Sequence, residues 1–541
     1  MKELFIFSEL SQPKNTLLKT FKYLLLSTVA ALMMYIAWPP QPITIAVFFA
    51  FIPLLFIADT VSNKKLFFAF VFIALLLWNV FTTWWIWNST SVGSIFAIVA
   101  NSFVMYLPWW GYYHTKNKFN KQISYLALIC FWMLFEYIHL NWELSWPWLS
   151  LGNVFANSPY WIQWYEYTGV GGGTLWILFC NILIFETTKQ WSTISAKVKF
   201  GYLLAVIFAI SFPIIISYQI ANNREKLIAK ANENVVIIQP NIDPYLKFES
   251  GNINSQIEKL VSLTASSIDS NTVLVLWPET ALSSAIPEDA ISNATVYKPI
   301  FDFLKNHPKI TLVSGIETYK IMSSETKYSQ KTTQDVYYES YNAAIAINSN
   351  KVSNIYIKSK LVPGVETLPS FLKILSPVFE RFGGTTGGYA KDETSKVFQI
   401  NNQLNVAPVI CYESIYGEYL STYIKKGANL ITILTNDGWW GNTAGHKQHL
   451  AYAKLRAIET RCWIVRSANT GISAVINDYG LVLNTLDWNK EGAIKQTVQI
   501  NNAKSFYVQH GDYLYFIFSI IAFILIGYFL FILLRKNKKT Q

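Results

Sequence analysis

The chain is poor in charge, in cysteine and in histidine. Only 14% of its 541 residues are Asp, Glu, Lys or Arg, whereas globular proteins average about 25%. Four cysteines are too few for a disulfide framework, and neither they nor the six histidines show the spacing of a zinc site. We therefore expect no metal and no cofactor, and we expect a large part of the chain to avoid water.

The shortage of charge is concentrated in the first part of the chain, whereas residues 219–510 resemble an ordinary soluble domain. Apolar stretches of about 20 residues predict helices that cross a ~30 Å hydrocarbon core. Eight such spans are predicted, at 18–37, 42–60, 65–86, 94–114, 124–141, 170–187, 200–220 and 513–534. The chain is thus divided into a helical membrane domain (1–220), an outer domain (221–510) and a last helix with a basic tail (511–541).

The lysines predict the orientation of these spans, because basic loops stay in the cytoplasm. Basic residues occur before span 1, between spans 2 and 3, 4 and 5, and 6 and 7, and after the last span. The alternate loops, 88–94 and 141–169, contain no Lys or Arg. We therefore expect residues 221–510 to lie outside the cytoplasm. The net charge of +11 then favours contact with anionic lipid, not nucleic acid.

The uncharged loop 141–169 is rich in aromatic residues, among them Trp148. Such residues are typical of a belt at the membrane interface, but they could equally form a wall that admits a lipid chain to the outer domain. Glu136 and His139, in or beside span 5, are ionisable groups at membrane depth and so functional candidates. Alternatively, they pair with each other.

The outer domain alternates short apolar runs with amphipathic ones, which favours an α/β sheet covered on its faces. Ligands bind such sheets beyond the carboxyl ends of the strands. Four predicted strands lead to polar residues there: 272–277 leads to Glu279, 354–358 ends on Lys358, 406–411 ends on Cys411, and 430–435 leads to Asn436-Asp437.

An acid, an amine and a thiol can form a nucleophilic site. Glu279 could take the thiol proton of Cys411 as general base, and Lys358 could stabilise the oxyanion of a tetrahedral intermediate. A helix starting near Ser414 would add its positive end. No histidine lies near these strand ends in the sequence. Each residue could instead be structural, and a disulfide between Cys411 and Cys462 would remove the nucleophile.

The residues around these positions resemble a known family. The strand-end Glu, Lys and Cys are similar to the triad of the nitrilase, or carbon–nitrogen hydrolase, superfamily. The longer strings resemble bacterial apolipoprotein N-acyltransferases: Leu276-Trp-Pro-Glu279-Thr, Lys358-Ser-Lys-Leu-Val-Pro-Gly-Val-Glu366, Val409-Ile-Cys411-Tyr-Glu413, Thr435-Asn-Asp-Gly-Trp-Trp-Gly441 and Trp146-Pro-Trp-Leu-Ser-Leu-Gly152. The resemblance covers nearly the whole chain.

The resemblance implies an α-β-β-α sandwich outside a bacterial inner membrane, with both termini cytoplasmic. It also implies acyl transfer from a phospholipid, through a thioester on Cys411, to the α-amino group of a diacylglyceryl-cysteine at a lipoprotein N-terminus. It gives supporting roles to Glu366, Tyr412 and Glu413. Possible substrate contacts are Trp277, Phe248, Asn436, Trp439 and Trp148.

Three positions depart from the family pattern: Pro363-Gly-Val-Glu366, Phe248 where a Trp is usual, and His139 where an Arg is common. The run Gly383–Gly388 lacks the ending of a phosphate-binding loop, and the stretch 363–395 is expected to cover the site. Two other functions remain open. One is a membrane-tethered amidase or nitrilase that gives the acyl group to water; the other is a transporter or receptor with an outer sensor domain.

Overall fold

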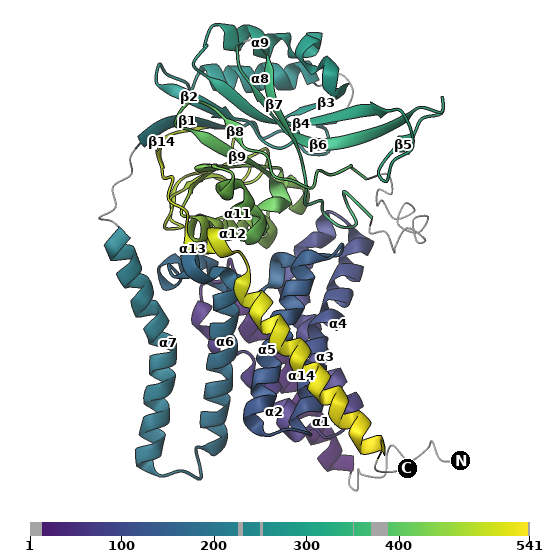
Figure 1. Cartoon of the computed structure of the whole chain (residues 1–541), viewed down its shortest axis with the longest axis vertical. Helices are drawn as coiled ribbons and strands as arrows, with labels where there is room; N and C mark the ends of the chain where they lie inside the picture. Colours follow the sequence, from purple (N-terminus) through teal and green to yellow (C-terminus); the bar gives the residue numbers. More distant parts are fainter. Residues whose placement is uncertain (1–12, 225–230, 249–252, 350, 369–387, 539–541) are drawn as a thin grey trace.

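A bundle of long helices supports an outer domain built on sheets (Figure 1). The structure is a computed structural model and describes residues 13–224, 231–248, 253–349, 351–368 and 388–538. Within these ranges, seven helices are long and apolar enough to cross a membrane. They are α1 (Pro13–Ala37), α3 (Lys64–Thr83), α4 (Ser91–Lys116), α5 (Lys121–Asn141), α6 (Tyr165–Gln190), α7 (Ala196–Arg224) and α14 (Tyr513–Lys538).

The predicted span 42–60 differs from this pattern, because it is not one continuous helix. A 3-10 helix, η1 (Thr44–Phe49), is followed by the short helix α2 (Ile52–Thr60). Pro53 lies in the first turn of α2. A proline is tolerated there, but because it lacks the N–H donor it cannot continue a preceding helix. Seven of the eight predicted spans are therefore full-length helices, and the remaining one, 42–60, is shorter and interrupted.

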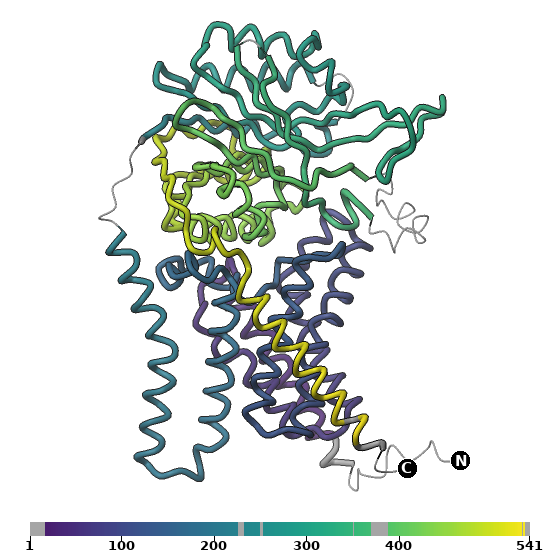
Figure 2. Tube along the Cα trace, in the orientation of Figure 1, coloured from purple at the N-terminus to yellow at the C-terminus, as the bar shows by residue number. Residues whose placement is uncertain are grey.

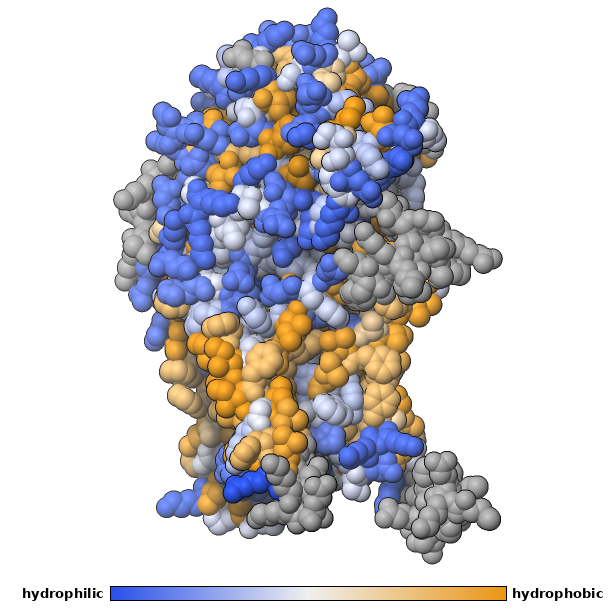
Figure 3. All heavy atoms as spheres, turned by 45° about the vertical axis from the view of Figure 1, so that its right-hand side comes forward, coloured by the Kyte–Doolittle hydropathy of each residue, from blue (hydrophilic) through white to orange (hydrophobic). Residues whose placement is uncertain are grey.

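The outer faces of the bundle are apolar. Figure 3 shows hydrophobic residues gathered over the helices, whereas the outer domain is mostly hydrophilic. On α7 and α14, for example, Phe208 and Phe523 are each 60% exposed. The chain passes through α7 before the outer domain and returns through α14, which packs along α5 (Figure 2). Apolar side chains exposed on long helices are suited to contact with lipid tails.

The outer domain contains two sheets within the described residues. The first has the order β14-β1-β2-β4-β6-β5, with β3 paired to β4 and β7 to β6; the second has the order β13-β12-β11-β10-β9-β8. The strands of the first sheet are β1 (Ala231–Gln239), β2 (Thr272–Leu276), β3 (Leu282–Pro287), β4 (Thr311–Met322), β5 (Gln330–Lys331), β6 (Tyr337–Ile347), β7 (Val352–Ile357) and β14 (Gly492–Ile500). Those of the second are β8 (Phe398–Gln399), β9 (Asn405–Ile410), β10 (Leu430–Thr435), β11 (Trp463–Ala468), β12 (Ser473–Ile476) and β13 (Val482–Leu486).

The two sheets form the middle layers of an α-β-β-α sandwich. Helices α8 (Ile253–Ala265) and α9 (Lys298–Lys305) cover the first sheet, and α11 (Gly417–Lys425) and α12 (Ala444–Thr460) cover the second (Figure 1). Alternate residues of β1 point to opposite layers: Val235 packs against the second sheet, whereas Val236 packs against α8. Both faces of each sheet are therefore buried, and the expected sandwich is confirmed.

Helix α12 joins the outer domain to the bundle. The Tyr452 hydroxyl on α12 accepts a hydrogen bond from Trp38 Nε1 (2.9 Å) and donates one to the carbonyl oxygen of Trp148 (2.7 Å). Nearby, Gln448 Nε2 donates to the carbonyl oxygen of Thr82 at 3.0 Å. The aromatic loop 141–169 is thus held between the helices and the second sheet's outer layer.

Candidate active site

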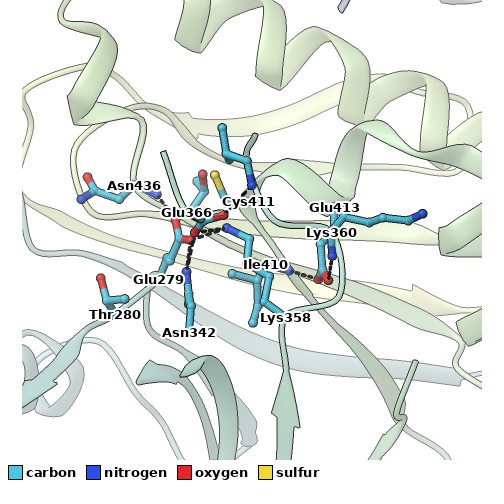
Figure 4. A network of polar contacts seen from close by, with 12 residues as sticks. Glu279, Thr280, Asn342, Lys358, Lys360, Glu366, Ile410, Cys411, Glu413 and Asn436 are labelled. Carbon is cyan, nitrogen blue, oxygen red and sulfur yellow. Dashed lines mark hydrogen bonds and ion pairs between the residues drawn. The ribbon is translucent and has the colours of Figure 1, made fainter. Parts of the chain in front are cut away.

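Four strand ends meet between the two sheets and the bundle. Glu279 follows β2, Lys358 follows β7, Cys411 follows β9 and Asn436 follows β10. The structure brings these residues, far apart in the sequence, into one cluster (Figure 4). Parallel strands place their carboxyl ends at one edge of a sheet, which is why residues at equivalent strand ends come together here.

Lys358 lies at the centre of the cluster. Its Nζ is 3.0 Å from Glu279 Oε1 and 2.8 Å from Glu366 Oε1, and its side chain is 1% exposed. Asn342 on β6 donates to both carboxylates through Nδ2, at 2.8 and 3.0 Å. The backbone N–H of Asn436 donates to Glu279 Oε2 at 3.1 Å. The two carboxylates therefore share one ammonium group and one amide.

This arrangement keeps Lys358 charged. Burial disfavours the ammonium form, but the facing carboxylates of Glu279 and Glu366 outweigh burial and raise the pKa of Lys358 well above its ordinary value. A permanently charged ammonium in a site that excludes water is suited to stabilise a developing oxyanion. It is not suited to accept a proton.

Cys411 occupies a strained turn at the end of β9. Its φ is +47°, a region that costs energy for residues other than glycine, and a short 3-10 turn, η9 (Cys411–Ile415), begins there. This turn, with α11 starting only at Gly417, replaces the helix expected near Ser414. In Figure 4 the sulfur points toward the cluster. The side chain is 8% exposed.

The Cys411 thiol is protonated in this environment. Burial and the neighbouring Glu279 carboxylate raise its pKa well above the ordinary value, and Lys358 only partly opposes them. Because only the thiolate is a strong nucleophile, the thiol needs a base at the moment of attack. The Glu279 carboxylate, which belongs to the same cluster, can be that base.

Glu413 ties the turn of Cys411 to the strand end of Lys358. One of its oxygens accepts from the Tyr356 hydroxyl (2.5 Å) and from the N–H groups of Ser359 (2.6 Å) and Lys360 (3.2 Å); the other accepts from the N–H of Ile410 at 2.9 Å. Burial raises the pKa of Glu413 to about 7, although these hydrogen bonds favour the charged form. The contacts suit a positioning residue.

A second buried network supports Cys411 from α12. His449 Nε2 lies 2.8 Å from Ser414 Oγ and 3.2 Å from the carbonyl oxygen of Cys411, and its Nδ1 lies 2.9 Å from Asp437 Oδ1. Arg466 holds the other oxygen of Asp437 at 2.5 Å. His449 was not predicted as a site residue, because it comes from the helix α12 and not from a strand end. Its contacts are with Asp437, Arg466, Ser414 and the carbonyl oxygen of Cys411, which suits support of the turn.

Two further residues near Glu279 were also missed. Lys247 Nζ donates to the carbonyl oxygen of Glu279 and to Thr280 Oγ1, both at 2.8 Å, and burial lowers its pKa to about 7. Asn342 is the other; its only signal in the sequence is that it is a polar residue in the apolar run 341–347. Gly315 allows this packing, because a Cβ there would lie 2.6 Å from Glu279 Cα.

An apolar cavity leads from Cys411 to the membrane helices. Its empty volume is about 1050 Å³, including the part open to the outside. Its lining includes Cys411 and Tyr412 as well as Ala97 and Ala100 of α4. Three tryptophans of the aromatic loop, Trp142, Trp146 and Trp148, also line it, as do residues 362–365 and Leu368. The cavity is suited to a long hydrocarbon chain.

The predicted substrate contacts do not all lie in the same part of the structure. Trp148 is 2% exposed and borders this cavity, and Tyr412 donates its hydroxyl to the carbonyl oxygen of Ser145 at 2.8 Å. Trp439 packs edge-on against Tyr245. Phe248 is 46% exposed. Trp277 packs in the core under α8 and donates to Thr264 Oγ1 at 3.0 Å.

The remaining candidates lie apart from Cys411. Glu136 accepts hydrogen bonds from Trp132, Thr174, Tyr515 and the N–H of Leu151, whereas His139 Nδ1 accepts from Trp142 Nε1. The two therefore have other partners than each other. All four cysteines are free, so Cys411 and Cys462 are not bridged. Of the expected cover 363–395, residues 369–387 lie outside the described residues, as do positions 383–387 of the glycine run.

Among the described residues, no group of three or more His, Cys, Asp or Glu side chains is arranged as a metal site.

Comparison with known proteins agrees with this architecture. The family model "carbon-nitrogen hydrolase" matches residues 234–507, and "apolipoprotein N-acyltransferase N-terminal domain" matches residues 30–183. The apolipoprotein N-acyltransferase of Chlorobaculum tepidum is 27% identical over 91% of this chain and 93% of its own length. That of Rickettsia prowazekii is 27% identical over 77% of this chain and 79% of its own length.

Among solved structures, Saccharomyces cerevisiae Nit3 of the nitrilase superfamily shares 16% identity, with a TM-score of 0.35 over 50% of this chain and 91% of that one. The two family models together account for both regions of the fold, the sandwich and the helical bundle. The chain belongs to the carbon–nitrogen hydrolase family, in the branch whose members carry the apolipoprotein N-acyltransferase N-terminal domain.

Proposed function

We propose that this protein is an apolipoprotein N-acyltransferase of the bacterial inner membrane. It takes a fatty acyl chain from a membrane phospholipid and transfers it to the α-amino group of an N-terminal S-diacylglyceryl-cysteine on a lipoprotein. The observation that carries the proposal is the position of Cys411, which belongs to a buried acid–amine cluster and also borders a cavity lined by membrane helices. The names of the relatives agree with this activity.

In the first half-reaction, Cys411 Sγ attacks the ester carbonyl of the phospholipid while Glu279 takes the thiol proton. The ammonium of Lys358 stabilises the oxyanion of the tetrahedral intermediate. When this intermediate collapses, the C–O bond to the glycerol breaks and Glu279 returns the proton to the leaving alkoxide. The products are a lysophospholipid and a thioester on Cys411.

In the second half-reaction, the α-amino group of the lipoprotein attacks the thioester carbonyl. Glu279 accepts a proton from the amine, the C–S bond breaks, and the thiol of Cys411 is restored. Glu366 holds Lys358 through its 2.8 Å contact, and Glu413 holds the turn at Cys411. Tyr412 and Trp148 border the acyl cavity. Asn436, Trp439, Phe248 and Trp277 are not among the residues that line this cavity, and for them we keep only the proposal that they affect substrate binding.

Exclusion of water distinguishes this transfer from hydrolysis. A membrane-tethered amidase or nitrilase would use the same three residues but pass the acyl group to water. The cavity beside Cys411 is lined mostly by apolar residues, and Glu279, Lys358 and Cys411 are almost fully buried. Both observations favour a site that keeps water from the thioester. A transporter would need polar or broken helices along a pathway, whereas these helices are mostly apolar.

We propose that the outer domain, residues 221–510, faces the extracytoplasmic side and that both termini are cytoplasmic. The basic loops gather at the end of the bundle far from the sheets: Lys121 pairs with Glu186 and Lys189 pairs with Asp59. The uncharged loops instead contact the outer domain, since Asn88 Nδ2 donates to the carbonyl oxygen of Trp440 at 2.8 Å. Basic loops favour the cytoplasm.

Intact-mass analysis of the purified protein tests the thioester. Incubation with phospholipid should add one fatty-acyl mass, and hydroxylamine should remove it because thioesters are labile to this nucleophile. Cys411→Ala should gain no such mass, whereas Cys462→Ala, which also loses a buried thiol, should behave as the wild type. An acyl adduct on Cys411→Ala would overturn the assignment of the nucleophile.

Addition of a diacylated lipopeptide with a free amine separates transferase from hydrolase. The acyl mass should move from the protein to the peptide amine, with little free fatty acid released. A lipopeptide whose amine is acetylated is the matched control and should leave the acyl-enzyme intact. Release of free fatty acid at the same rate with either peptide would identify a hydrolase.

A further inference from the structure

A second hollow, polar in character, lies beside the acyl cavity. It is bordered by the end of α5 and the aromatic loop, by the segment around β5, and by the residues on either side of positions 369–387. Three lysines contribute to its lining: Lys327, Lys360 and Lys391. The hydroxyl-bearing residues Tyr328, Ser359 and Tyr389 also line it.

The two hollows are adjacent. Trp142, Ser145 and Leu368 line both of them. Lys360 follows Lys358 by only two positions, and its backbone N–H is held by Glu413. In Figure 4 its side chain points away from the Glu279–Lys358–Cys411 cluster. A single molecule can therefore occupy the polar hollow with one part and the acyl cavity with another.

The polar hollow carries an excess of positive charge. Among the described residues, none of the three lysines forms an ion pair, and Glu143 is the one carboxylate in the lining. Lys360 lies over the rings of Tyr416 and Tyr419, with Nζ at 5.2 and 5.7 Å from their centroids. Burial and the positive charge of Lys391 both lower the pKa of Lys360.

A bound anion would relieve this repulsion. Lys360, whose charged form is disfavoured by burial and by Lys391, gains from an anion placed between the two lysines, because an opposite charge favours the charged form. Charge-assisted hydrogen bonds from ammonium groups to phosphate oxygens are among the stronger ones in proteins. The hydroxyl groups of Tyr328 and Ser359 in the same lining can donate further hydrogen bonds, whereas that of Tyr389 already donates to Glu317.

We propose that this hollow binds the phosphodiester group of the phospholipid acyl donor while its acyl chain occupies the adjacent apolar cavity. This inference rests on the proposed function and adds where the donor's head group lies. In a glycerophospholipid the phosphate and the ester carbonyls are linked by the short glycerol, so a phosphate held beside Leu368 and Ser145 leaves an ester carbonyl directed toward Cys411. The lysines thus position the donor and take no part in bond breaking.

The first half-reaction, measured without acceptor, tests this position. The variant combines Lys360→Gln with Lys391→Gln; the control combines Lys309→Gln with Lys351→Gln, which removes the same charge from exposed sites elsewhere on the outer domain. Acylation of Cys411 is followed by intact mass in mixed micelles, with phosphatidylglycerol at increasing mole fraction. A second donor, p-nitrophenyl palmitate, has an ester and an acyl chain but no phosphate.

We expect the Lys360/Lys391 variant to need about tenfold more phosphatidylglycerol for half-maximal acylation, with p-nitrophenyl palmitate unaffected and the control variant unchanged. Inorganic phosphate at the same concentration as the lipid should not inhibit the wild type. The inference would be overturned by equal effects on both donors, by no effect on either, or by a defect confined to transfer onto the lipopeptide. Inhibition of the wild type by inorganic phosphate at that concentration would also overturn it, because the site would then bind the free anion and not the donor's phosphodiester group. If phosphatidylglycerol fails to acylate even the wild type, the proposed function falls as well.

Discussion

The outer domain pairs several buried acids with buried bases, whereas the core of the helical bundle holds the carboxylate of Glu136 with neutral donors alone. Between the sheets, acids and bases are packed together: Glu279, Glu366 and Lys358 in one cluster, and Asp437 with Arg466 in another. In the bundle, the buried carboxylate of Glu136 is satisfied instead by neutral donors. In the proposed function, the reaction takes place where buried charges are paired, and the acyl chain lies where charges are scarce.

The difference teaches how one site can serve a reaction between a lipid and an amine. Stabilising a developing oxyanion needs a fixed ammonium in a dry site, which only a domain with paired charges can bury at acceptable cost. Binding a long acyl chain needs an apolar cavity open toward the bilayer. Cys411 lies at the boundary and belongs to both.

Removal of the Lys358 ammonium group, which tests the role of the paired charges in the outer domain, should have the largest effect. We expect Lys358→Met to lower the acylation rate at least 1000-fold, on the order of 4 kcal/mol, and to destabilise the outer domain by about 3–5 kcal/mol because two carboxylates lose their shared cation. Single-turnover acylation and thermal unfolding measure the two effects. Lys351→Met, at an exposed position, should change neither; activity in Lys358→Met near the wild-type level would contradict the role of Lys358.

Filling the cavity tests the apolar half. Ala97→Phe on α4 should slow acylation by a C16 phospholipid by roughly 10- to 100-fold, since overpacking an apolar site costs about 1–3 kcal/mol, and should slow it less for a C8 donor. The comparison is Val99→Phe, two residues along α4 and exposed, which should leave both rates unchanged. Equal rates for the two chain lengths in Ala97→Phe would show that the acyl chain binds elsewhere.

The pH dependence of alkylation sharpens the electrostatic account of Cys411. Burial and then Glu279 raise the pKa of this thiol, and Lys358 lowers it. Glu279→Gln should therefore shift the pH profile of iodoacetamide labelling to lower pH, and Lys358→Met should shift it to higher pH. Peptide mapping quantifies labelling at Cys411 separately from the other three cysteines. Shifts in the same direction for both variants would refute this assignment of charges.

The smallest effect is expected for Glu136, the buried carboxylate of the bundle that accepts hydrogen bonds only from uncharged groups. Glu136→Gln keeps the size of the side chain but replaces one acceptor oxygen with a donor, so some of its four hydrogen bonds are lost. We expect a loss of about 1–3 kcal/mol in stability, seen as a lower Tm in detergent, with the rate of acylation within about twofold of the wild type. A large loss of activity without loss of stability would show that Glu136 acts on substrate.

Much of the site was predictable because it lies at strand ends. The strands leading to Glu279, Lys358 and Cys411 are short apolar runs followed by polar residues. Such a pattern is typical of buried strands and can be recognised in the sequence. β14 and β13 were not expected: β13 is largely exposed, and β14 reads as a polar edge strand. The missed residues Lys247 and His449 come from a loop and a helix, where no local pattern indicates what they contact.

The sequence by itself determined the spans, the apolar strands and the side on which basic loops gather, because these depend on composition within about 20 neighbouring residues. The sharing of Lys358 by two carboxylates and the meeting of Cys411 with a cavity lined by α4 were decided only by the tertiary structure. Each of these brings together residues that are tens to hundreds of positions apart, such as Glu279 with Lys358 and Ala97 with Cys411. Such contacts depend on how whole layers pack, and local sequence does not encode them.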